Sequence, residues 1–269
     1  MSRLNMVHMS DLHFSGTYNS LQPDDALELA GIALAEDFGE SPLVLSISGD
    51  ITTKGDLNGY HEALGSIKKH LFAKLNIEKI ALCPGNHDIV NGDKYFRDFN
   101  KFAYALTHDY LQNWNQNNPV CKIEYNKYAF LLVNSAYLGD YRFGAVPITA
   151  LETALRSSRD KYCIIIIHHS PISSAYGGEG LTESYELLAT AARENAIALL
   201  HGHVHSDQVL LLGSKPTLVS GAASLAFSPD PNMNNQFCAY IFDEGHLEKA
   251  YTYTYTANRN KFIPKEMTL

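Results

Sequence analysis

The sequence predicts a layered α/β domain, and three observations support this fold class. Strand-like and helix-like segments alternate up to about residue 205, and only strand-like segments follow from Gln208 onward. Clusters of Asp, Asn and His follow several apolar runs, as expected where a site forms at the carboxyl ends of strands. A length of 269 residues allows one large domain or two small ones, and the lack of a Pro/Ser-rich linker favours a single domain, 1–269.

Strands are predicted where short apolar runs lie between polar or turn residues. In the first half of the chain these runs cover 4–10, 43–48 and 79–83. Helices are predicted between and after them, at 24–38 with Asp24 as the cap, at 56–75 and at 93–106. The Asn-rich segment 107–119 predicts a loop.

The second half begins with a predicted hairpin, whose strands at 121–125 and 128–135 meet near Asn126. Apolar runs that end in histidines predict strands at 163–169 and 196–205, and helices are expected at 147–156 and 182–194. Later strands are predicted at 209–213, 217–221, 237–243 and 249–256. We expect these last strands to extend a second sheet.

The composition argues against a general affinity for polyanions, because the formal net charge is −8. No apolar run reaches the ~18 residues of a membrane span, and the first residues lack the apolar region of a signal peptide. We therefore expect no membrane partner, and nucleic acid is not favoured. The cysteines lack metal-type CxxC spacing, which predicts reduced thiols and a cytoplasmic location.

Asp11 and His13 stand two residues apart after the first predicted strand. In an extended segment, residues i and i+2 point to the same side, so the carboxylate and the imidazole could share a cation. The alternative is a turn Asp beside an unrelated His.

Two further clusters follow the second and third strands. Asp50 comes after Gly49, which allows a tight turn; the alternative is a capping Asp. Asn86, His87 and Asp88 follow a Pro-Gly turn. An amide oxygen is a ligand for hard cations, so we expect Asn86 on a metal and His87 beside it.

Histidines end the two apolar strands of the second half. Burying an unpaired imidazole costs free energy, so at least one of His168 and His169 should have a use. His168 is the expected ligand, whereas His169 should point the other way, either toward substrate or as support. His203 and His205 are expected on one face, and His201 deeper in the core.

Together the clusters supply seven candidate ligands: Asp11, His13, Asp50, Asn86, His168, His203 and His205. This oxygen and nitrogen set without thiolate suits Mn, Fe or Zn rather than Ca or Mg alone. If Asp50 bridges, two divalent or trivalent ions each receive four protein ligands. Two carboxylates against two divalent ions leave a charge of about +2, which would attract a phosphate group.

Taken in order, these clusters resemble the motifs of the calcineurin-like metallophosphoesterases. The motifs D-x-H, G-D-x-x-x-x-G, G-N-H-D, H-H-x-P and G-H-x-H begin at Asp11, Gly49, Gly85, His168 and Gly202. The resemblance implies a four-layer α/β/β/α sandwich with a dinuclear metal site at the carboxyl ends of the strands.

The resemblance also implies roles for the candidate residues. One ion would take Asp11, His13, Asp50 and His205, and the other would take Asp50, Asn86, His168 and His203. Asp50 and His87 are the expected catalytic residues, Asn86, His87 and His169 the expected substrate contacts. Attack by a metal-bound hydroxide on phosphorus is implied, with His87 assisting the leaving group and Asp88 orienting His87.

Within the family, the pattern looks most like the cyclic-nucleotide phosphodiesterase branch, and no Arg stands near any motif. We expect a metal-dependent phosphodiesterase for a small phosphodiester or nucleotide. The alternatives are a nuclease or phosphomonoesterase of the same fold, or a non-catalytic scaffold or sensor. Substrate selection is expected in 91–119 and 173–181, where 174–182 is either a lid or a plain loop. The sequence identifies no protein partner.

Overall fold

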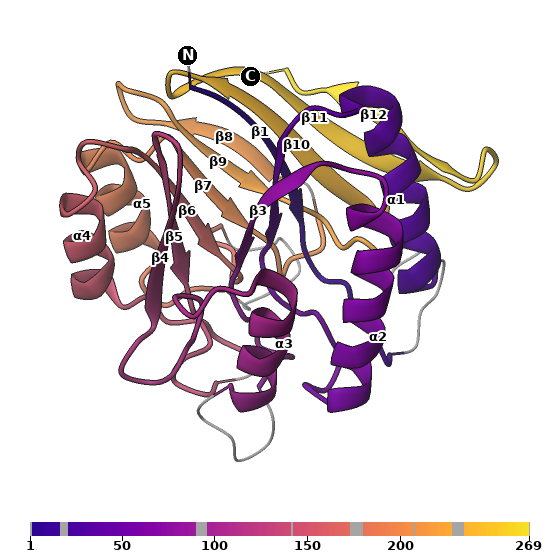
Figure 1. Ribbon diagram of the computed structural model, residues 1–269. Coiled ribbons are helices and arrows are strands. Elements are labelled where there is room, and N and C mark those ends of the chain that lie inside the picture. Colours follow the sequence, from indigo (N-terminus) through magenta and orange to yellow (C-terminus); the bar gives the residue numbers. More distant parts are fainter. Residues whose placement is uncertain are drawn as a thin grey trace.

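The computed structural model describes residues 2–16, 21–89, 96–140, 142–172, 180–206, 208–227 and 234–268. Two six-stranded sheets face each other in the described part (Figure 1). The first has the order β12-β11-β10-β1-β2-β3. Its strands are β1 (Arg3–Met9), β2 (Leu43–Ile47), β3 (Ile77–Leu82), β10 (Gln236–Asp243), β11 (His246–Thr256) and β12 (Lys261–Glu266).

The second sheet has the order β4-β5-β6-β7-β9-β8. Its strands are β4 (Val120–Tyr125), β5 (Tyr128–Val133), β6 (Tyr162–Ile167), β7 (Ala198–His201), β8 (Gln208–Leu212) and β9 (Thr217–Gly221). Strands β5, β6, β7 and β9 run parallel, as do β1, β2 and β3. The arrows in Figure 1 show that the parallel strands of both sheets end at the same end of the molecule.

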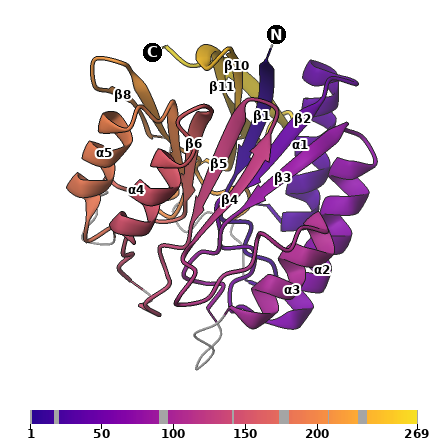
Figure 2. The ribbon, with the colours of Figure 1, turned by 60° about the vertical axis from the view of Figure 1, so that its left-hand side comes forward.

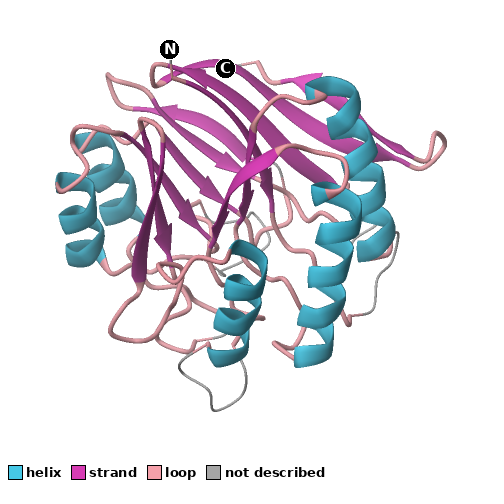
Figure 3. Ribbon diagram, viewed as in Figure 1, coloured by secondary structure: helices cyan, strands magenta, loops and turns pink. Residues whose placement is uncertain are grey.

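Helices cover the outer face of each sheet (Figures 2 and 3). On the side of the first sheet lie α1 (Pro23–Phe38), α2 (Leu57–Ile67), the π-helical turn η1 (Lys68–Phe72) and α3 (Arg97–Thr107). On the side of the second sheet lie α4 (Ile148–Arg156) and α5 (Ser184–Arg193). The predicted four-layer α/β/β/α sandwich is confirmed.

Burial on both faces explains why the central strands are continuous apolar runs. In β6, Ile165 and Ile167 pack in a core cluster with Leu151 of α4 and Leu187 of α5. Their neighbour Ile166 belongs to the other cluster, which also contains residues of the first sheet. A strand covered on both sides has no solvent face, so it shows no polar alternation.

Several predicted boundaries differ from the structure. Gln22 rather than Asp24 holds the N-cap position of α1, because Pro23 opens the helix and places Asp24 in its first turn. The helix predicted at 56–75 divides into α2 and η1. The last strands do not all extend the second sheet, because β10 pairs with β1. Residues 93–95 of the predicted third helix lie outside the described ranges.

No helix within the described ranges is both long enough and apolar enough to cross a bilayer. The cytoplasmic location stays a prediction.

His8 on β1 is a titratable group buried in the core. Its Nε2 lies 2.8 Å from the hydroxyl of Ser48. Burial, together with repulsion from His201, lowers the pKa of His8 from 6.5 to about 3. The ring is therefore neutral in the folded chain but protonated in the unfolded chain at mildly acidic pH. Because the unfolded state then binds more protons, this group lowers stability as the pH falls below 6.5.

We expect the free energy of unfolding of the metal-free protein to fall between pH 7 and pH 5. In the His8→Gln variant, the slope of the unfolding free energy against pH should be smaller by up to about 1.4 kcal/mol per pH unit. The reason is that this variant takes up one proton fewer on unfolding. Urea unfolding at several pH values measures it. The exposed-residue variant His61→Gln serves as the control, and an unchanged slope in His8→Gln would contradict the prediction.

Candidate metal centre

The predicted ligands come together at the carboxyl ends of the parallel strands. Asp11, Asp50 and Asn86 follow β1, β2 and β3 of the first sheet, and His168 follows β6 of the second. His203 and His205 follow β7, which ends at His201 rather than at the predicted residue 205; its pairing with β9 stops at His201. The two sheets therefore each contribute part of the cluster.

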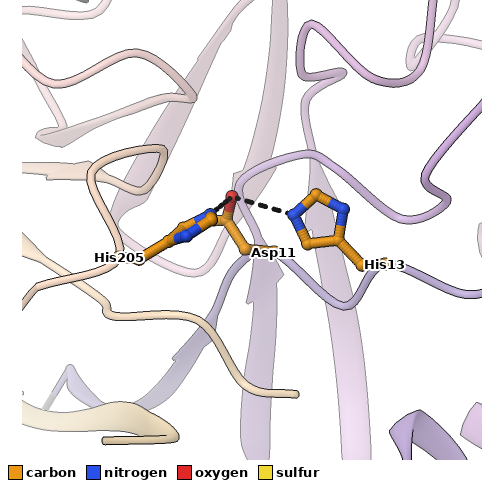
Figure 4. A group of neighbouring side chains, drawn as sticks. All are labelled: Asp11, His13 and His205. Atoms are coloured by element: carbon orange, nitrogen blue, oxygen red, sulfur yellow. Dashed lines mark hydrogen bonds and ion pairs between the residues drawn. The ribbon is translucent and has the colours of Figure 1, made fainter. Parts of the chain in front are cut away.

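One group of side chains consists of Asp11, His13 and His205 (Figure 4). The Oδ1 atom of Asp11 lies 3.0 Å from Nε2 of His205 and 3.7 Å from Nε2 of His13. The carboxylate of Asp11 is fully buried. Both imidazoles therefore direct a ring nitrogen toward the same carboxylate oxygen, with the donor types of a metal site.

Asp50 lies between this group and a second one. Its Oδ2 atom is 3.9 Å from Nε2 of His13 and 3.3 Å from Nε2 of His168. Its Oδ1 atom accepts a hydrogen bond of 2.8 Å from the backbone N–H of His87. A single carboxylate oxygen thus faces ligands from both predicted sets, which is the placement that a bridging ligand needs.

The second group forms around His168. Its Nδ1–H donates to the carbonyl of Ser48 at 2.7 Å, which turns Nε2 toward the amide oxygen of Asn86 at 2.9 Å. The ring of His203 packs beside that of His168, with centroids 5.1 Å apart. Nε2 of His13 and Nε2 of His203 are buried and have no hydrogen-bond partner among the described residues. Leaving such nitrogens without a partner would be costly, and a bound cation or water would satisfy them.

The charges of the centre favour a cation. Burial alone would raise the pKa of the Asp11 carboxyl, but His205 and His13 outweigh it and hold this pKa well below its usual range. The Asp50 pKa is lowered in the same way, chiefly by His168. Burial opposes protonation of His168, yet Asp50 raises its pKa to about 9. The site where Asp50 and Asn86 converge therefore favours positive charge, which a proton on His168 supplies in this structure. The oxygen and nitrogen donors at this point also fit a metal ion, which would take the place of that proton.

The backbone at the ligands is not extended, contrary to the reasoning from residue spacing. Five of the seven candidate ligands have positive φ: Asp11 at 55°, His13 at 52°, Asp50 at 52°, His203 at 72° and His205 at 50°. The side chains converge because the chain turns through left-handed conformations. Such conformations are uncommon for residues with a Cβ, and they cluster at functional sites.

Three glycines allow the ligand loops to approach one another. A Cβ on Gly85 would lie 2.2 Å from Oδ1 of Asp50, and one on Gly202 would lie 1.8 Å from the hydroxyl of Ser10. Gly49, which has a φ of +94°, faces the backbone of Gly85 and the ring of His168. Any side chain at these positions would displace a group of the centre.

His87 is oriented by a backbone carbonyl. Its Nδ1–H donates to the carbonyl of Thr53 at 2.8 Å, and its side chain is half-buried. The prediction that Asp88 orients His87 is not supported, because the Asp88 carboxylate accepts bonds from the Gly85 N–H and the Tyr60 hydroxyl, both at 3.0 Å. The first bond lies within the loop after β3, and the second joins this loop to α2. Asp88 thus holds the position of its loop.

His169 and His201 are both fully buried. The Nδ1 atom of His169 lies 2.7 Å from the hydroxyl of Ser135, and its ring packs 4.5 Å from that of His203. This placement favours a supporting role, and a substrate contact of His169 stays a prediction. His201 ends β7, in agreement with the expected core position.

Sequence reasoning missed Phe227 and Ser224, which follow β9. The ring of Phe227 lies 4.7 Å from that of His13, and Ser224 donates to the carbonyl of Asp11 at 2.8 Å. Their segment is apolar and carries no motif, so the one available signal was its position after a strand end. The segment 174–182, expected to be either a lid or a plain loop, lies mostly outside the described residues.

A two-sheet α/β sandwich with a buried carboxylate–histidine cluster at its strand ends defines a metal-binding protein. The family profile described as calcineurin-like phosphoesterase matches residues 4–207. The chain therefore belongs to the calcineurin-like phosphoesterase family. No significant match is found among curated proteins.

Solved structures share this fold. A purple acid phosphatase from yellow lupin (Lupinus luteus) seeds superimposes with a TM-score of 0.65 at 14% identity, over 97% of this chain and 53% of that protein. The chain thus spans about half the length of this phosphatase. GAP50 of Plasmodium, described as the anchor in the inner membrane complex, gives a TM-score of 0.54 at 11% identity, over 99% and 89% of the two chains.

We predict that Gly85→Ala weakens metal binding by at least about tenfold, because the added Cβ would push the Asp50 carboxylate out of place. Titration of metal-stripped protein with Mn²⁺ measures the affinity, and thermal unfolding reports whether the variant folds. Gly65→Ala on α2 is the matched control, because its Cβ would meet no atom within 4 Å. Wild-type Mn²⁺ affinity in a folded Gly85→Ala protein would refute the prediction.

Proposed function

We propose that this chain is a metal-dependent phosphoesterase that hydrolyses a phosphodiester, with a small diester or nucleotide as substrate. The position of Asp50 carries the proposal. One of its oxygens faces His13 from the first ligand group and His168 from the second. A single buried carboxylate that faces two sets of ligands is suited to hold a pair of cations.

In this proposal, residues 1–269 form one catalytic domain and two ions occupy the two groups. One ion takes Asp11, His13, Asp50 and His205, and the other takes Asp50, Asn86, His168 and His203. Ions of this kind, when bound, lower the pKa of water and stabilise the negative charge that develops on the phosphoryl oxygens. Mn, Fe and Zn all suit the oxygen and nitrogen donors.

The protein itself supplies orientation and a proton. The bond from His87 to the Thr53 carbonyl fixes the ring through Nδ1. The half-buried ring lies 5.0 Å from that of His13, one of the proposed ligands. We assign Nε2 of His87 to proton transfer toward the leaving oxygen. The backbone N–H of His87 donates to the Asp50 carboxylate, which couples the position of His87 to that of the proposed bridging ligand.

The charge around the centre favours a diester over a monoester. No arginine occurs in the segments that carry the proposed ligands. A phosphomonoester carries about two negative charges near neutral pH and commonly meets an arginine clamp, whereas a diester carries one. A monoesterase and a nuclease remain the alternatives within the same chemistry, and the similar lupin protein is itself a phosphatase.

A non-catalytic role is the second candidate, because the fold is shared with a protein described as an anchor. Fold similarity does not establish activity. The complete set of seven donors in this chain supports an enzyme instead, since an anchor has no need for buried imidazoles with unsatisfied nitrogens.

Replacing Asp50 or Asn86 by Ala should reduce hydrolysis by at least about 100-fold in a protein that remains folded, because each change removes a proposed ligand. Turnover is measured on a phosphodiester and a phosphomonoester after metal stripping and reloading with Mn²⁺. Asn76→Ala, which changes an exposed Asn, is the control for Asn86→Ala. Undiminished hydrolysis by folded Asp50→Ala would rule out the mechanism, and monoester preference would rule out the diester proposal.

If His87 protonates the leaving oxygen, its loss should matter most for poor leaving groups. We expect His87→Ala to slow hydrolysis of an alkyl ester by about 100-fold, and that of a 4-nitrophenyl ester by less than about tenfold. The comparison uses two methyl phosphodiesters that differ only in the leaving group. An equal loss on both esters would assign His87 to phosphate binding instead.

A further inference from the structure

Phe227 forms part of the wall of the metal centre without offering a ligand atom. Its ring centroid lies 4.7 Å from that of His13, at an interplanar angle of 47°. It lies 5.3 Å from that of His205, at 73°. Both imidazoles are proposed ligands of the same ion. An aromatic ring therefore borders this ion's ligands on one side.

Hydrogen bonds hold the backbone of Phe227 to the loop that carries Asp11. The Ser224 hydroxyl donates to the carbonyl of Asp11 at 2.8 Å and accepts the N–H of Phe227 at 2.8 Å. The N–H of Leu225 donates to the carbonyl of Ser10 at 3.0 Å. The backbone of Phe227 is thus tied to the strand end that carries Asp11, and its ring packs beside His13 and His205 before any ligand binds.

Phe227 also differs from its segment in exposure. The preceding residues, from Ala222 to Ala226, are all buried, whereas Phe227 is only partly buried. Its remaining surface is apolar, in contrast to the amide of Asn86 and the imidazole of His87 at the same centre. Apolar surface beside a polar centre suits the part of a substrate that is not phosphate.

We propose that Phe227 binds the organic substituent of the phosphate substrate, and that this substituent is a nucleobase. This inference rests on the proposed phosphoesterase function, which places a phosphate at the ligands next to the ring. Stacking on an aromatic ring accepts any base, because every base has a π-face. Phe227 would then let the site bind nucleotides more tightly than alkyl phosphates. The metal ligands cannot make this distinction, because both kinds of molecule carry the same phosphate group.

A purely structural role predicts a different behaviour. If Phe227 only packed His13 and His205 in place, its removal would weaken metal binding and would affect all phosphate ligands alike. A role in base binding predicts an effect only on ligands that carry a base. The two roles therefore predict different ratios of nucleotide affinity to methyl phosphate affinity. This ratio can be measured without reference to the activity of the metal-loaded protein.

The test measures binding of adenosine 5′-monophosphate and of methyl phosphate to Mn²⁺-loaded protein by calorimetry. Both are monoesters of the kind that hydrolysis of a diester releases, so the proposed reaction does not consume them during the measurement. In Phe227→Ala we expect affinity for the nucleotide to fall about tenfold and affinity for methyl phosphate to change less than about twofold. Phe227→Trp should keep the nucleotide affinity. Tyr110→Ala, which removes an exposed aromatic residue after α3, is the control. Metal content and thermal midpoint are measured for each variant.

Equal weakening of both ligands in Phe227→Ala, or loss of bound Mn²⁺, would overturn the proposal and leave Phe227 a packing role. A wild-type protein that binds the nucleotide no more tightly than methyl phosphate, or that binds neither, would overturn it too. Selective nucleotide binding through Phe227 without turnover of any ester would support this inference and contradict the proposed hydrolytic function.

Discussion

The buried carboxylate of Asp50 is the group on which the rest of the centre depends. It follows β2 of the first sheet, yet it lies 3.3 Å from His168, which follows β6 of the second. A buried anion without compensating positive charge or hydrogen bonds would cost several kcal/mol. The N–H of His87 and the rings of His168 and His13 surround it. This buried charge therefore helps to join the carboxyl ends of the two sheets.

This arrangement requires an unfavourable backbone. A left-handed conformation costs roughly 1–2 kcal/mol for a residue with a Cβ, and it occurs at Asp11, His13, Asp50, His203 and His205. The sandwich can hold these conformations because its central strands, such as β5 and β9, are buried at every position. The well-packed core thus maintains the strain at the centre.

The fold itself does not decide what the centre does. The same sandwich is found in a phosphatase and in a protein described as an anchor, each less than 15% identical to this chain. The chemistry comes from the side chains at the strand ends. In this chain His87 is oriented through Thr53, and Phe227 is tied to Asp11 through Ser224. These two residues distinguish the site from a simple set of metal ligands.

The sequence by itself determined the α/β class, the candidate ligands and their placement after strands, because apolar runs that end in Asp or His are visible along one chain. The tertiary structure decided how the ligands meet. His203 donates its N–H to Asp11, 192 positions earlier, and β10 returns to pair with β1. The positive φ angles, the role of Asp88 and the position of Phe227 also escaped prediction. Each results from packing between segments distant in sequence, which residue spacing does not encode.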